Sequence, residues 1–252
     1  MTFKAAPESY DRFMGRFSRR LAPLFADFAG IDAGMSVLDV GCGPGALTEE
    51  LARRLGGKRV AAADPSEPFV EGCRDRVPDA DVRLAPGEQL PWDDGSFDAA
   101  VSQLAVNFMT DAPAAARELV RVVRPGGTAA ACTWKQDGMQ MLTSFWDAAK
   151  AVRPEAPKEN KASNYRTEEE LRTLWLGAGF DEVAAGELEV SFTYERFDDF
   201  WQPYTAGVGP AGAYLASLPA ETGDAIREEA KRQLGAGPFE LRGVACAVRG
   251  SA

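Results

Sequence analysis

The stretch Val37-Leu-Asp-Val-Gly-Cys-Gly-Pro-Gly45 decides the fold that the sequence predicts. It joins a short apolar run to three glycines at alternate positions. Ala46–Leu55 follows with leucines every fourth residue, the pattern of a helix with one apolar face. Glycines let a ligand approach the backbone closely, and the start of a helix offers unpaired N–H groups to an anion. The stretch therefore predicts a strand, a ligand-binding loop and a helix in succession.

Further strands and helices alternate along the first half of the chain, after a predicted helix over residues 8–29. The additional strands are predicted from short apolar runs at residues 58–63, 82–84, 97–102 and 128–133. One of the intervening helices is capped by Asp111 and holds Pro113 in its first turn. Alternation with a period of roughly 20–30 residues indicates a doubly wound α/β fold, in which helices cover both faces of a mainly parallel sheet.

The second half is less regular, and we expect it to add insertions to one domain that spans residues 1–252. Thr167-Glu-Glu-Glu170 is a capping box that opens a helix. Two more strands are predicted, over residues 188–193 and 239–249. The expected boundaries are 8–134 for the ligand-binding core, and 135–165 and 195–238 for helical insertions that form a lid.

The composition excludes several classes of function. The net charge of −10 disfavours a nucleic-acid partner, because such binding depends on Lys and Arg contacts to phosphates. The chain has no histidine and no C-x-x-C pair among its four cysteines, so neither a metal site nor a histidine-based triad is predicted. No apolar run approaches the ~20 residues of a membrane span, and the first residues lack the pattern of a signal peptide. We therefore expect a cytoplasmic protein without a membrane span.

An acidic residue ends the second predicted strand. Asp64 lies where a carboxylate accepts hydrogen bonds from a ribose in doubly wound sheets. Asp64 and the glycine loop together are compatible with more than one kind of ligand. Gly41, Gly43 and Ala46 also satisfy the dinucleotide pattern G-x-G-x-x-A, which is compatible with a nicotinamide or flavin cofactor. A tight structural turn without a ligand explains the glycines as well.

Four ordered segments together resemble the motifs of class I S-adenosylmethionine-dependent methyltransferases, and the resemblance covers roughly residues 8–134. Val37–Gly45 is similar to the first motif, and Ala62-Ala-Asp-Pro65 is similar to the acidic end of strand two. Residues 88–98 resemble the loop before strand four, and residues 119–127 resemble the corner before strand five. The subgroup is similar to quinone-biosynthesis and other small-molecule methyltransferases. The family implies a Rossmann-like, seven-stranded sheet whose last strand is antiparallel to the rest.

The resemblance implies which residues contact S-adenosyl-L-methionine, whose product is S-adenosyl-L-homocysteine. Asp39 would orient the glycine loop near the methionine amine, Asp64 would hold the ribose hydroxyls, and Gln103 would face the methionyl group or the methyl. The loop residues implied in cofactor binding are Gly41, Cys42, Gly43 and Gly45.

The adenine contacts are implied for Pro65, Gly87 and Glu88. Related sequences often carry an aspartate just before the Gly87 position, where it accepts from the adenine amino group. Here Pro86 stands there, and its side chain cannot accept a hydrogen bond. Either Glu88 takes that role or backbone groups recognise adenine.

Other residues are candidates for contact with the cofactor or the acceptor. Tyr10, Asn107 and Trp134 are candidates to face the substrate, and Arg16 is a candidate to pair with the cofactor carboxylate. Methyl transfer depends mainly on holding nucleophile and methyl in line, and a general base is optional. A chain without histidine can therefore perform it.

We expect S-adenosylmethionine-dependent methyl transfer to a small-molecule substrate. Two alternatives remain open at this stage: a non-catalytic protein that binds S-adenosylmethionine, and a nicotinamide-dependent oxidoreductase. The sequence predicts neither the catalytic group, nor the identity of the acceptor, nor the oligomeric state.

Overall fold

The fold is built on one seven-stranded sheet with the strand order β3-β2-β1-β4-β5-β7-β6. The computed structural model describes residues 11–157, 164–207 and 209–252. The strands are β1 Val37–Val40, β2 Val60–Asp64, β3 Asp81–Leu84, β4 Phe97–Gln103, β5 Val123–Met139, β6 Asp181–Tyr194 and β7 Phe239–Ser251. Neighbouring strands from β3 to β5 pair in parallel, and β7 is antiparallel to both of its neighbours. The expected doubly wound sheet with an antiparallel last strand is thereby confirmed.

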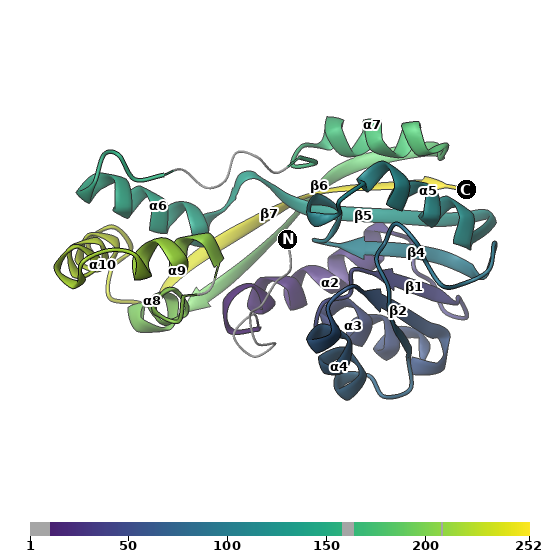
Figure 1. Ribbon diagram of the computed structural model, residues 1–252, viewed down its shortest axis with the longest axis horizontal. Helices are drawn as coiled ribbons and strands as arrows, with labels where there is room; N and C mark the ends of the chain where they lie inside the picture. Colours follow the sequence, from purple (N-terminus) through teal and green to yellow (C-terminus); the bar gives the residue numbers. More distant parts are fainter. Residues whose placement is uncertain (1–10, 158–163, 208) are drawn as a thin grey trace.

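Helices cover both faces of the sheet (Figure 1). A π-helical turn, Asp11–Gly15, leads into the first α-helix. The α-helices are α2 Arg16–Phe28, α3 Ala46–Leu55, α4 Glu67–Arg76, α5 Ala112–Val122, α6 Gln140–Val152, α7 Glu168–Ala178, α8 Phe197–Thr205, α9 Gly209–Ala216 and α10 Ala220–Leu234. In Figure 1, α2, α3 and α4 lie on one side of the sheet and α5 and α7 on the other. The described residues form two large apolar clusters and a small one: the first lies under α2 and α3, the second under α5 and α7, and the small one under α4.

Two predicted helix starts are confirmed in detail. The Asp111 side chain accepts a hydrogen bond from the Ala114 backbone N–H over 2.9 Å at the start of α5. Thr167 and Glu170 form both hydrogen bonds of the capping box at the start of α7. Within the described ranges, no helix combines the length and the apolar character that a bilayer crossing requires.

Two strands are much longer than the sequence predicted. β5 was expected over 128–133 and β6 over 188–193, but they span 123–139 and 181–194. The last residue pair between β4 and β5 is Gln103 with Cys132, so β5 continues past the end of β4 without it. It remains paired with β7, and β6 pairs with β7 as far as Tyr194 opposite Phe239. A three-stranded extension therefore reaches beyond the carboxyl ends of the parallel strands.

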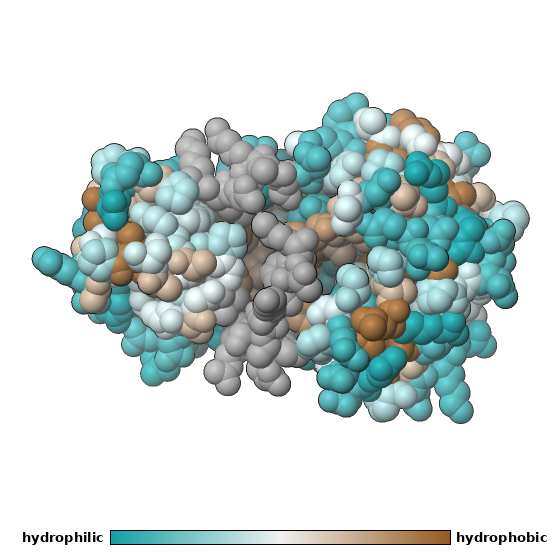
Figure 2. Space-filling model, in the orientation of Figure 1, coloured by the Kyte–Doolittle hydropathy of each residue, from teal (hydrophilic) through white to brown (hydrophobic). Residues whose placement is uncertain are grey.

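The extension carries a helical lobe made of α6, α8, α9 and α10 (Figure 1). Stacked and edge-on aromatic rings fill its interior, including Phe145 against Tyr204 with ring centroids 4.6 Å apart and Phe145 against Trp146 at 5.2 Å. Polar residues predominate on the visible surface of the sheet half, whereas residues of intermediate hydropathy are frequent on the lobe (Figure 2). The helices of this lobe lie within residues 135–165 and 195–238, and it stays a prediction that these segments are insertions and form a lid.

Candidate functional site

The glycine loop, residues 41–45, joins the end of β1 to the start of α3. The backbone N–H groups of Gly41 and Cys42 both donate to the Ala63 carbonyl on β2, over 2.8 and 3.0 Å. Gly41 has a φ of +76°, and a Cβ placed on it would lie 2.3 Å from the Cβ of Ala105, so only glycine fits. Gly43 has a φ of +53°, but a Cβ there would meet nothing within 4 Å. The loop thus packs tightly at Gly41 and leaves space beside Gly43.

Asp64 ties this loop to the end of β2. The side chain is buried, with 7% of the residue exposed. One carboxylate oxygen accepts from the Gly43 N–H and the other from the Ser66 N–H, each over 2.9 Å. Burial raises the pKa of Asp64, and these two hydrogen bonds oppose the rise. The structure therefore brings together Gly43 and Asp64, as expected, while the neighbouring Pro65 is exposed.

Asp39 lies on β1, behind the loop. It is buried, and its Oδ2 accepts a hydrogen bond from the Thr48 hydroxyl over 2.7 Å. Its other oxygen, Oδ1, has no hydrogen-bond partner among the described residues. Burial is the largest cause that raises the pKa of Asp39 to about 7, and the charge of Asp64 adds to it. A buried carboxylate oxygen without a donor is costly, so this position favours an incoming cationic donor.

Gln103 and Trp134 share one face of the sheet with Asp39. Asp39 is paired with Val101 on β4, and Gln103 follows two residues later on that strand. Gln103 is paired in turn with Cys132 on β5, and Trp134 follows two residues after Cys132. Because side chains alternate along a strand, all three point to the same side. The Gln103 amide N–H donates to the Ser18 carbonyl over 3.1 Å. Within the described chain, Oε1 of Gln103 and Nε1 of Trp134 are buried without a hydrogen-bond partner.

Two of the predicted adenine contacts, Gly87 and Glu88, lie in the turn after β3. Gly87 is packed so closely that an added Cβ would be 3.0 Å from Cε of Met109 and 3.2 Å from Cγ1 of Val40. The turn is therefore held against the end of β1. Glu88 accepts hydrogen bonds from the N–H groups of Thr110 and Asp111, over 2.8 and 3.1 Å. This contact gives Glu88 a structural role before α5 that its sequence position did not reveal.

The remaining candidates are Arg16, Asn107 and Tyr10. The guanidinium of Arg16 donates to the Asp199 carbonyl over 3.3 Å and stands over the rings of Phe192 and Tyr194, at 5.2 and 5.8 Å. The structure thus groups Arg16 with β6 and α8. Asn107 is half-buried in a 3₁₀ turn after β4. Tyr10 lies outside the described residues.

Sequence reasoning missed Thr48 and Cys73. Thr48 is fully buried on α3 and bonds across to Asp39, and Cys73 on α4 donates its thiol to the Thr48 hydroxyl over 3.5 Å. The thiol of Cys42 lies in the same small cluster as Cys73 and donates to the Gly43 carbonyl over 3.4 Å. The one available sign was a threonine among the apolar residues of a predicted amphipathic helix.

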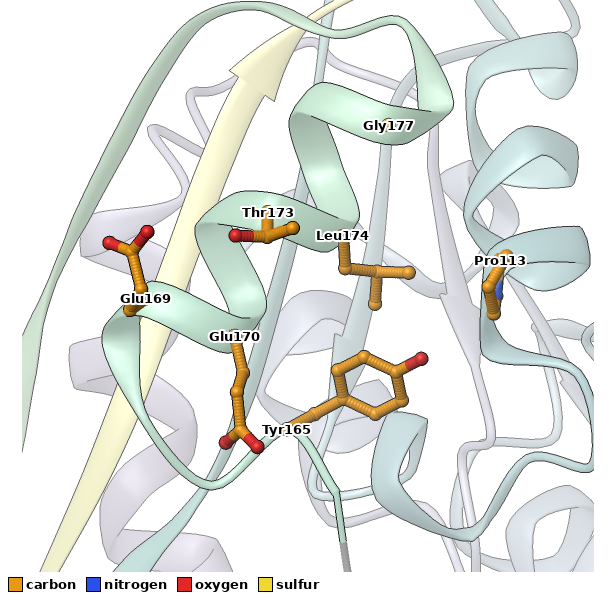
Figure 3. A pocket seen from close by; sticks show the side chains of 7 residues that line it. All are labelled: Pro113, Tyr165, Glu169, Glu170, Thr173, Leu174 and Gly177. Atoms are coloured by element: carbon orange, nitrogen blue, oxygen red, sulfur yellow. The ribbon is translucent and has the colours of Figure 1, made fainter.

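A separate groove lies between helix α7 and the first turn of helix α5 (Figure 3). Its volume is about 370 Å³, and the Tyr165 ring fills part of it beside Leu174 and Pro113. None of the residues predicted to bind cofactor or substrate lines this groove. The arrangement on β1, β2, β4 and β5 remains the better candidate site.

Comparisons with known proteins identify the family. A model of a methyltransferase domain matches residues 38–131. The malonyl-[acyl-carrier protein] O-methyltransferase of Serratia marcescens is 32% identical over 180 residues, which cover 68% of this chain and 69% of that protein. The chain belongs to the class I S-adenosylmethionine-dependent methyltransferases. The expected family is thereby confirmed.

Two further matches agree with this class I methyltransferase assignment. The Salmonella typhimurium protein, also named malonyl-[acyl-carrier protein] O-methyltransferase, is 37% identical over 56% of this chain, and the match spans 59% of its own length. A solved structure from Anaeromyxobacter dehalogenans, named as a type II methyltransferase, has a TM-score of 0.64 at 24% identity and covers 92% of this chain and 95% of that one. The latter likeness supports the methyltransferase fold alone.

Proposed function

We propose that this class I methyltransferase binds S-adenosylmethionine between the glycine loop and Asp64, and transfers its methyl group to a small-molecule acceptor. The hydrogen bond from the Gly43 N–H to Asp64 carries the proposal, because it joins the two expected halves of the cofactor site at one edge of the sheet. The space beside Gly43 and the unpartnered oxygen of Asp39 both fit a bound ligand with an ammonium group.

The residues at this edge fit the separate parts of the cofactor. Asp64 would accept from the ribose hydroxyls, since a carboxylate has about four acceptor positions and the structure uses two. Asp39 would lie near the methionine ammonium, and Gly41, Cys42, Gly43 and Gly45 would line the methionyl part. Pro65 and Gly87 would flank adenine. Glu88 can still contribute to adenine binding, but its Oε1 already accepts two backbone hydrogen bonds.

The chain's own contribution to the reaction is position and polarity. When bound, the cofactor supplies a methyl group that its sulfonium has already activated. Holding an acceptor in line with that methyl contributes about 7–11 kcal/mol by effective molarity, whereas a general base adds only about 10²–10⁴-fold. Oε1 of Gln103 and Nε1 of Trp134 provide one acceptor and one donor with which the methyl acceptor could be oriented.

The acceptor is proposed at the level of a small molecule. The relatives from Salmonella and Serratia are named for a malonyl group on acyl-carrier protein, but their matches leave about a third or more of each protein unmatched. We further propose that residues 1–252 form one methyltransferase domain, in which the helical lobe contributes to acceptor binding.

Isothermal titration with S-adenosylmethionine tests the proposal. We expect binding at one site per chain, followed by transfer of labelled methyl to a member of a metabolite panel. No heat and no thermal shift at millimolar cofactor would refute the cofactor assignment. Binding without methyl incorporation into any acceptor would favour a non-catalytic role, and binding of reduced nicotinamide cofactor in its place would favour an oxidoreductase.

A further inference from the structure

We infer that Thr48 is a positioning residue for the proposed cofactor site, because its hydroxyl holds the Asp39 carboxylate turned so that one oxygen is left for the cofactor's ammonium group. The inference rests on the proposed function, because it concerns how the same site holds its ligand. Thr48 itself would not touch the cofactor.

The hydrogen bond from Thr48 to Asp39 links α3 to β1. A threonine within a helix often returns its hydroxyl to the carbonyl four residues earlier. Here the Thr48 hydroxyl instead donates to Oδ2 of Asp39 over 2.7 Å, a normal length for a hydroxyl hydrogen bond. Both groups are buried, so water cannot replace this bond. Oδ1 is consequently left free of partners among the described residues.

A thiol on α4 orients the Thr48 hydroxyl. Cys73 donates to Oγ1 of Thr48 over 3.5 Å. A hydroxyl has a single proton, and with its oxygen accepting from Cys73 that proton is directed to Asp39. A chain of hydrogen bonds thus joins α4, α3 and β1 and ends on the carboxylate.

Burial and the charge of Asp64 on β2 oppose the ionisation of Asp39. The other titratable groups near it are the thiols of Cys42 in the loop, Cys73 on α4 and Cys132 on β5, whose pKa values the charge of Asp39 raises. The hydrogen bonds that lower the pKa of Asp39 both come from Thr48. Without the hydroxyl, the carboxyl group would hold its proton to a higher pH and present no negative charge to an ammonium group.

The test compares Thr48→Val, which keeps the shape and removes the hydroxyl, with Thr48→Ser, which keeps the hydroxyl. The dissociation constant for S-adenosylhomocysteine is measured by titration calorimetry between pH 5.5 and 8.5. For the wild type we expect affinity to fall as pH drops below about 7, where Asp39 takes up a proton. Thr48→Val should bind at least about tenfold more weakly at pH 7, with the acidic limb displaced to higher pH. Thr48→Ser should restore the wild-type profile.

A packing role predicts a different outcome. If Thr48→Val and Thr48→Ser weaken binding equally with an unchanged pH profile, or if Thr48→Val binds like the wild type, the inference is overturned. Thr48→Ala serves as a second hydroxyl-free variant if valine prevents folding, which far-ultraviolet circular dichroism detects. If the wild type binds no S-adenosylhomocysteine at any pH, the proposed function itself is overturned. That result is distinct from one in which the wild type and Thr48→Val both bind equally well, which overturns only the role of Thr48.

A double-mutant cycle gives an independent readout. In an Asp39→Asn background there is no carboxylate to keep ionised, so Thr48→Val should no longer change the affinity or the pH profile. An effect of Thr48→Val that is the same in both backgrounds would contradict the inference.

Discussion

Two buried carboxylates on neighbouring strands differ in their hydrogen-bond partners. Asp64 accepts from two backbone N–H groups, whereas Asp39 accepts from the Thr48 hydroxyl and keeps one oxygen unpartnered within the described chain. Asp64 is therefore held in place before any ligand arrives. Asp39 carries an electrostatic cost that a cationic ligand would relieve.

Replacing Asp64 by alanine should weaken cofactor binding while the fold persists. The change removes charge-assisted hydrogen bonds to the ribose, and the expected loss is ~1.5–3 kcal/mol of binding free energy, about 10–100-fold in the dissociation constant. Titration calorimetry with S-adenosylmethionine measures the loss, and circular dichroism checks the fold. An unchanged dissociation constant would show that Asp64 does not hold the ribose.

Replacing Asp39 by asparagine should stabilise the cofactor-free chain at alkaline pH. The folded pKa of about 7 exceeds the ordinary value of 3.8, so between these pH values the folded chain keeps a proton that the unfolded chain has lost. Stability contributed by this group therefore falls as pH rises from about 4 to about 7. At pH 8 the variant should gain up to about 4 kcal/mol in the free energy of unfolding.

That gain should shrink to about 1.5 kcal/mol at pH 5 and approach zero only below about pH 4, where Asp39 is protonated in both the folded and the unfolded chain. Urea unfolding of both proteins at pH 5 and pH 8, without cofactor, measures the difference. The same gain at both pH values would show that Asp39 does not titrate in this range.

At this scale, sequence patterns predicted the places of Asp64 and the glycine loop in the fold better than the contacts that support them. Asp64 and the glycines lie at the ends of recognisable apolar runs, so their positions follow from the alternation of strands and helices. Thr48 and Cys73 act through contacts between α3, α4 and β1, and no local pattern specifies such contacts. Arg16 contacts β6 and α8, which are 170 or more residues away in the sequence.

Among the elements, the glycine loop shows two different needs for glycine. Both have a positive φ, which favours glycine, but Gly41 also packs closely against Ala105, while Gly43 has open space where a Cβ would lie. A Gly41→Ala change should therefore cost about 2–5 kcal/mol of stability, from left-handed backbone strain and overpacking together. Gly43→Ala should cost only about 1–2 kcal/mol of stability, because its added Cβ meets no atom.

For the Gly43→Ala variant we expect a clear loss of cofactor affinity, although its loss of stability is the smaller of the two. Gly43→Ala places a methyl group in the proposed site, so its dissociation constant for S-adenosylmethionine should rise despite its stable fold. Urea unfolding and titration calorimetry on the two variants give both quantities. Equal losses of stability, or full affinity in Gly43→Ala, would contradict this account of the loop.

The sheet core was predictable because β1 and β2 are buried throughout and are short and apolar. The extensions of β5 and β6 were not predictable in the same way. Residues 135–137 of β5 are Lys, Gln and Asp, Asp137 has a φ of +56°, and the register with β7 shifts between Trp134 and Met139. Locally this sequence is typical of a turn, and only the pairing with β7 makes it part of a strand.

Over the whole molecule, the extension of β5, β7 and β6 connects the sheet core to the helical lobe. One apolar cluster runs through both parts, from Val37 and Leu47 in the core to Tyr204 and Ile226 in the lobe. We therefore expect the two parts to unfold together as one domain.

Phe17 is well placed to test this cooperativity. It is fully buried on α2, with its ring centroid 6.4 Å from that of Trp134 and 6.0 Å from that of Phe192. Phe17→Ala should lower the free energy of unfolding by about 3–5 kcal/mol in a single transition. Tryptophan fluorescence and far-ultraviolet circular dichroism should give coincident curves. Two separate transitions in the wild type would show instead that core and lobe are independent units.

The central claim is that S-adenosylmethionine lies between the glycine loop and Asp64, and a crystal structure with bound S-adenosylhomocysteine tests it most directly. The account predicts the ribose hydroxyls within hydrogen-bond distance of Asp64 and the ammonium group beside the free oxygen of Asp39. A ligand bound elsewhere, such as the groove between α5 and α7, or a ribose that makes no contact with Asp64, would contradict it.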